Sequence, residues 1–181
     1  MTFNPKTCVV SIRHQENRKK IVGTGFVVDE RHVLTCAHVI AKAGAEPGDT
    51  VRLKFEATGS FSRAKILVDF YRDRFREDLA VLELIRPIPE GVQVAPLAPH
   101  APTRPFLAYG YHALDVREEL PSSYAHGDIL NDIPHNAGFS LLQLNAPQKI
   151  AGMSGGPILD TVVNRAVGMG LGVAILPADF A

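Results

Sequence analysis

Short apolar segments, separated every few residues by glycine or proline, are the feature that most limits how this chain can fold. Its 181 residues include 15 glycines and 13 prolines. The runs between them are rich in valine, isoleucine, leucine and phenylalanine, as is typical of strands joined by turns. Alternation is clearest at residues 51–57, where Val51, Leu53 and Phe55 share one face. Because no long stripe of apolar residues has helical spacing, the sequence predicts an all-β protein.

The predicted strands fall into two sets. The first set covers residues 8–13, 21–29, 32–35, 51–57, 64–70 and 79–84, and the second covers 106–112, 124–130, 139–144, 158–160 and 166–175. One short helix is predicted at residues 37–42, because Gly44 follows it and glycine commonly ends a helix.

A proline-rich segment separates the two sets. Residues 87–105 hold six of the 13 prolines, and proline cannot donate to a sheet ladder, so we predict an extended connector here. The predicted organisation is an N-terminal half at residues 1–86, the connector at 87–105 and a C-terminal half at 106–181. The two halves together form one domain.

Composition excludes several functional classes. The chain is 46% hydrophobic and 21% charged, and its 19 basic and 19 acidic residues balance, so no net charge draws it to nucleic acid or to an anionic membrane. No apolar stretch has the length of a signal peptide or a membrane helix, which favours a cytoplasmic protein. In a reducing cytoplasm Cys8 and Cys36 are expected to be buried free thiols. Their spacing predicts no metal site.

The segment GMSGGP at residues 152–157 is the most informative stretch. Glycines around a serine allow a sharp turn that can aim backbone N–H groups at one point. Acyl transfer requires this arrangement, with Ser154 as nucleophile and the N–H groups of Gly152 and Ser154 as an oxyanion hole. Taken alone, the glycines could also be present only because the turn requires residues with positive φ.

Two further residues have a catalytic and a structural interpretation. His38 follows an apolar run and opens the predicted helix, and it could equally be a core histidine. Asp78 precedes the apolar run at residues 79–84, where a carboxylate could simply be solvated. If Asp78 lies beside His38, it would hold the imidazole while the ring takes the serine proton.

The three motifs together carry more information than any one of them. TCAHV around His38, DLAVLEL from Asp78 and GMSGGP around Ser154 follow one another at separations of 40 and 76 residues. In sequence and in order these motifs resemble those of the trypsin/chymotrypsin-like serine peptidases. The short loops are more similar to those of the bacterial branch than to those of the secreted digestive enzymes. The resemblance covers most of the chain and implies two packed six-stranded antiparallel β-barrels with His38, Asp78 and Ser154 in the cleft between them.

Zymogen activation after Lys20 is rejected, although Ile21 and the residues after it look like a new N-terminus of that family. The family's new terminus pairs with an aspartate directly before the nucleophile, and this chain has Met153 there. Met153 also leaves open a latent enzyme whose oxyanion loop must be ordered by a partner.

The substrate pocket departs from trypsin's pattern. Gln148 stands six residues before Ser154, where trypsins carry an aspartate for arginine or lysine. The facing wall is expected from residues 168–173, with Gly170, Leu171 and Gly172 lining an uncharged pocket. Small or medium uncharged side chains are therefore expected before the cleaved bond.

The expected function is a serine endopeptidase that needs no cofactor and acts on polypeptides. Because the chain ends soon after its last predicted strand, we expect the N-terminal protease module of a larger bacterial signalling or defence protein, with sensor or NTPase domains as possible partners. The alternative is a latent or non-enzymatic peptide-binding module, because a fold alone does not establish activity.

Overall fold

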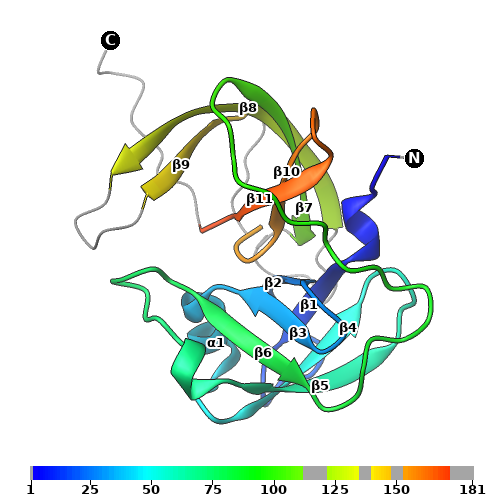
Figure 1. Ribbon diagram of the computed structural model, residues 1–181. Coiled ribbons are helices and arrows are strands. Elements are labelled where there is room, and N and C mark those ends of the chain that lie inside the picture. The colour runs from blue at the N-terminus through cyan, green and yellow to red at the C-terminus, as the bar shows by residue number, and fades with distance from the viewer. Residues whose placement is uncertain (1, 112–121, 135–139, 148–152, 172–181) are drawn as a thin grey trace.

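Two antiparallel β-sheets, one above the other, build the molecule (Figure 1). The computed structural model describes residues 2–111, 122–134, 140–147 and 153–171. The first sheet is a closed barrel in the order β1-β2-β3-β6-β5-β4. Its strands are β1 (Val9–Arg13), β2 (Ile21–Val27), β3 (His32–Thr35), β4 (Thr50–Phe55), β5 (Phe61–Ile66) and β6 (Ala80–Leu84).

The second sheet is a curled half-barrel with five strands among the described residues, in the order β11-β10-β7-β8-β9. These strands are β7 (Arg104–Tyr111), β8 (Ser122–Pro134), β9 (Ser140–Asn145), β10 (Pro157–Asp160) and β11 (Arg165–Met169). The predicted all-β, chymotrypsin-like class is confirmed. The implied second barrel appears as this half-barrel, and residues 172–175 of the last predicted strand lie outside the described part of the chain.

Local structure departs from the sequence prediction at residues 68–70. This segment was predicted to end a strand, but Val68–Phe70 is the 3-10 helix η2, and β5 begins earlier, at Phe61. Side chains alternate between the two faces along β5. Ala64 and Ile66 face the core, whereas Phe61 faces solvent. A second 3-10 helix, η1 (Pro5–Thr7), was not predicted.

The predicted short helix is confirmed as α1 (Ala37–Ala43). Gly44 ends it in the left-handed conformation, at φ 74°, which glycine adopts without steric cost. Among the described residues, no helix is long and apolar enough to cross a membrane.

The connector between β6 and β7 runs along one side of both sheets (Figure 1) and is bonded to each of them. The N–H of Ala95 donates to Val27 O at 2.9 Å, and the N–H of Ala166 donates to Pro96 O at 2.7 Å. The connector therefore fastens the two halves to each other.

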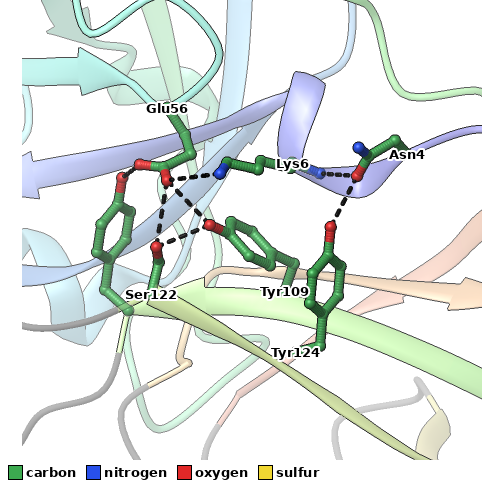
Figure 2. Close-up of polar contacts among 7 residues, drawn as sticks. Asn4, Lys6, Glu56, Tyr109, Ser122 and Tyr124 are labelled. Carbon is green, nitrogen blue, oxygen red and sulfur yellow. Dashed lines mark hydrogen bonds and ion pairs between the residues drawn. The ribbon is translucent and has the colours of Figure 1, made fainter.

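A polar cluster also joins the halves (Figure 2). Glu56, just after β4, accepts through Oε1 from the Tyr109 hydroxyl at 2.9 Å and from Ser122 Oγ at 3.2 Å. Tyr111 donates its hydroxyl to Oε2 of the same carboxylate, and Lys6 Nζ lies 3.8 Å from Oε1. A carboxylate of the first barrel is thus held by three hydroxyl groups of the second sheet.

These contacts change the titration of the groups involved. Burial alone would raise the pKa of Glu56, but the hydrogen bonds from Tyr111, Tyr109 and Ser122 outweigh it and hold that pKa below its ordinary value. Burial, together with the nearby Glu56 carboxylate, raises the pKa of Tyr109 to about 12. The cluster therefore favours an ionised glutamate and neutral tyrosines.

Candidate active site

His38 is the second residue of α1 and lies three residues after the end of β3. The helix can lie close to β2 because residue 23 is glycine. A Cβ there would come within 2.6 Å of both methyl carbons of Val39. The absence of a side chain at Gly23 therefore helps to position the helix that carries His38.

Asp78 contacts His38 at two points. Its Oδ2 lies 2.6 Å from His38 Nδ1, and its Oδ1 accepts from the backbone N–H of His38 at 2.9 Å. Both side chains are mostly buried, at 16% and 12% exposed. One carboxylate therefore orients the imidazole and satisfies a backbone donor in the first turn of α1.

Asp78 itself is held in a restrained backbone conformation. Its φ of 51° lies in the left-handed region, which aspartate tolerates better than most residues. Its N–H donates to Asp73 O at 3.0 Å, and Arg72 and Leu79 exchange two backbone hydrogen bonds of 2.8 and 3.0 Å around the loop. This closed loop fixes the carboxylate before β6 begins.

Ser154 lies in a tight turn that is seated on the first barrel. Its carbonyl accepts from the N–H of Thr24 at 3.0 Å. Gly155 has φ 86°, and a Cβ at this position would lie 2.0 Å from Thr24 O. The N–H of Gly156 donates to Met153 O at 2.8 Å. The glycines after the serine are thus required by close backbone packing as well as by the turn.

One carbonyl joins the histidine segment to the serine turn. Gly170 O accepts from the thiol of Cys36 at 3.2 Å and from the N–H of Gly155 at 2.7 Å. Cys36 is two residues before His38, so the histidine segment and the serine turn share an acceptor. The predicted free, buried thiols are confirmed for Cys36 and Cys8. Burial raises both thiol pKa values, to about 12 for Cys8, and the charge of Asp78 raises that of Cys36 further.

The predicted pocket residues are only partly described. The N–H of Gly170 donates to Gly156 O at 2.9 Å, and Leu171 packs against the main apolar core. Their role in a pocket wall stays a prediction. Gln148, Gly152 and Gly172 lie outside the described residues.

The described residues include one group whose atoms could together approach a metal ion. Ligand atoms of Cys36, His38 and Asp78 lie within 4.8 Å of one another. Each already has a protein partner, because the thiol donates to Gly170 and the imidazole pairs with the carboxylate. The donors are arranged for hydrogen bonding within the protein.

Other histidine–carboxylate contacts are more exposed. His32 Nδ1 lies 2.8 Å from Asp29 Oδ2, and His100 Nε2 lies 3.1 Å from Asp132 Oδ1. The His38–Asp78 pair differs by its burial, since Asp29 Oδ1 likewise accepts from the backbone N–H of His32, at 2.8 Å.

Sequence reasoning missed the residues of the first barrel that support the serine turn. Thr35 donates its hydroxyl to Thr24 O at 2.7 Å, and Thr24 Oγ1 accepts from the N–H of Tyr111 at 3.0 Å. Met153 is fully buried in the apolar cluster of the second sheet. The glycines on both sides of Thr24 were the available signal, since they indicate a strand approached closely by other backbone.

Comparison with known proteins assigns the family. The trypsin-like peptidase domain family matches residues 23–169, most of the sequence. The chain belongs to this family. It is a serine endopeptidase, a hydrolase of the trypsin-like class.

Several solved structures share the fold. The active form of the Rv3671c protease from M. tuberculosis superposes with a TM-score of 0.69 at 22% identity, covering 94% of this chain and 72% of that one. Deg5 gives 0.65 at 24% identity, covering 93% and 80%. The HtrA-type protease AlgW, solved with a decapeptide, gives 0.66 at 21% identity, covering 88% and 45%. The search of curated proteins gave no match.

Proposed function

We propose that this peptidase cleaves polypeptides through an acyl-enzyme on Ser154. The observation that carries the proposal is the 2.6 Å contact between His38 Nδ1 and Asp78 Oδ2, because it leaves Nε2 as the ring nitrogen able to take a proton. His38 removes the proton of the Ser154 hydroxyl as that oxygen attacks the scissile carbonyl. It then returns the proton to the leaving amine.

Asp78 stabilises the imidazolium formed during each transfer. The N–H groups of Gly152 and Ser154 receive the developing oxyanion. The N–H groups of Gly155 and Gly156 are engaged by Gly170 O and Met153 O, which supports assigning the oxyanion to the two residues proposed. In the second half of the reaction water attacks the acyl group, with His38 again acting as base.

A fluorophosphonate probe tests this mechanism, since it labels a serine that is activated beside an oxyanion site. We expect labelling of the wild-type chain and none of Ser154→Ala, while a matched Ser60→Ala variant labels normally. A folded wild-type sample that is not labelled would contradict the proposal. It would favour the alternative of a latent or purely peptide-binding module.

We propose further that the domain is a cytoplasmic protease module of a larger bacterial signalling or defence protein. The similar peptidase fold of AlgW lies within a chain of which this one covers 45%, which supports the idea of a module. An uncharged residue before the cleaved bond is proposed from Gln148 in place of an aspartate. Cleavage-site mapping on a peptide library, and the size of the native protein on an immunoblot, test these two points.

A further inference from the structure

A pocket on the outer wall of the first barrel lies away from the catalytic residues. It has a volume of about 450 Å³. Its lining residues are Arg52, Phe61, Ser62, Arg63, Ile85 and Arg86. Asp78 precedes β6 and Ile85 follows it, so at about 3.3 Å per residue the pocket is roughly 20 Å from the His38–Asp78 pair.

Three arginines line the pocket, and two of them repel each other across neighbouring strands. Arg52 of β4 and Arg63 of β5 are directly opposite each other in the antiparallel register. Like charges in this position destabilise a sheet. Among the described residues, neither they nor Arg86 form an ion pair, whereas Glu83 on the neighbouring strand pairs with Arg31 at 3.8 Å. The charges of the three pocket arginines are therefore left uncompensated within the described part of the protein.

Large apolar side chains stand among these charges. Phe61 and Ile85 are 57% and 54% exposed. The side chains of Arg13 and Lys54 each approach the Phe61 ring, with the charged group 5.7 Å from its centre. A simple anion would satisfy the arginines but leave the apolar surface in water. Carboxylates around a large apolar side chain would satisfy both.

We propose that this pocket is a docking site for an acidic segment of the polypeptide substrate, with a large apolar residue among its carboxylates. The barrel is closed, so strand addition is excluded there and the segment is recognised by side chains. When this segment is bound, the scissile bond elsewhere in the same polypeptide stays near Ser154, so its effective concentration there rises. The assignment of the segment to the substrate rests on the proposed peptidase function.

Binding is measured first in the Ser154→Ala background, so that it does not depend on catalysis. The probe is a fluorescein-labelled peptide with glutamates around a central phenylalanine, followed by anisotropy. We expect saturable binding that weakens with salt. Replacing its glutamates by glutamine, or its phenylalanine by glycine, should weaken binding about tenfold or more, corresponding to about 1.4 kcal/mol.

The protein variants provide matched controls. Arg63→Glu should weaken binding at least about tenfold. It should keep or raise the melting temperature, because an opposite charge then faces Arg52. Arg165→Glu changes an exposed arginine of β11 in the other sheet and should leave binding unchanged. Equal binding by Arg63→Glu and wild type would overturn the proposal.

Competition and kinetics identify the ligand class. Inorganic phosphate or a single-stranded oligodeoxynucleotide that displaces the peptide at equal concentration would overturn the peptide assignment. In the active chain, the same acidic segment fused to a cleavable reporter should lower KM about tenfold in wild type but not in Arg63→Glu. No cleavage at all, with peptide binding intact, would count against the proposed function and against a substrate as the source of the segment. An unchanged KM would overturn the substrate assignment alone.

Discussion

Cys36 donates its thiol to the carbonyl of Gly170 at 3.2 Å, across the interface between the first barrel and the second sheet. The same carbonyl accepts from the N–H of Gly155, the residue after Ser154. A thiol two residues before His38 thus contacts the support of the serine turn, and this link predicts a role in positioning the two segments.

Cys36→Ala should reduce kcat/KM several-fold, because a neutral hydrogen bond contributes about 0.5–1.5 kcal/mol. Cys8→Ala is the matched control, since Cys8 is equally buried and donates to Pro5 O at the same 3.2 Å. Steady-state kinetics and thermal melts separate the effects. Equal loss of activity in both variants would mean that Cys36 acts only through general stability.

Asp78→Asn should lower kcat by about 10⁴-fold, the scale found when this role is removed in trypsin-like enzymes. The amide can donate to His38 Nδ1 and so favours the wrong tautomer. Asp29→Asn makes the same change at the more exposed contact with His32 and should leave the rate unchanged. A small effect of Asp78→Asn on single-turnover acylation would argue against the assigned role.

Met153→Ala should destabilise the protein by about 2–5 kcal/mol, the range for truncating a buried methionine. Met153 directly precedes Ser154 and is 2% exposed, so the cavity also loosens the turn. Denaturant unfolding measures the first effect and fluorophosphonate labelling at low temperature the second. Full labelling of a destabilised variant would show that the side chain supports only the fold.

Gly155→Ala should abolish labelling, because its Cβ would lie 2.0 Å from Thr24 O and its φ is positive. Gly59→Ala tests the contribution of φ alone. Gly59 has φ 69°, but the nearest atom to its Cβ is the flexible Lys54 Cε at 3.8 Å. That variant should lose about 1 kcal/mol of stability and keep its activity. Comparable losses in both variants would remove the case for a specific contact with Thr24.

Glu56→Gln should weaken the joint between the halves in a pH-dependent manner. The pKa of Glu56 is lowered in the folded protein, so its contribution is present above the ordinary carboxyl pKa of about 4.3. It is lost as pH falls through the lowered folded value. The difference in unfolding free energy between wild type and variant should therefore shrink from pH 6 towards pH 3. Exposed Glu90→Gln should show no such trend.

Prediction from sequence was most successful where the signal was local. The alternation of Val51, Leu53 and Phe55 and the ending of α1 at Gly44 both depend on near neighbours, and both are confirmed. The prediction was wrong at Val68–Phe70, where apolar residues continue after a strand but the chain turns into a 3-10 helix. Apolar composition alone does not distinguish these two conformations.

In the candidate site, too, only features with a local sequence signal could be predicted. The order of the motifs identified the His38 and Asp78 segments, and their direct contact is present. The contacts of Thr24 with the serine turn and the shared acceptor Gly170 join residues more than 100 positions apart. Such contacts depend on the packing of the two sheets, which sequence spacing does not encode.

The seating of the serine turn on Thr24 has a consequence for synthesis. Residues 1–86 leave the ribosome before the serine turn and form the surface against which that turn packs. Ser154 can take up this position only after its own turn and Gly170, which accepts from Gly155, have also been synthesised. A peptidase domain that still lacks these residues is therefore expected to be inactive, so its cleavage of neighbouring polypeptides cannot begin before the domain is complete.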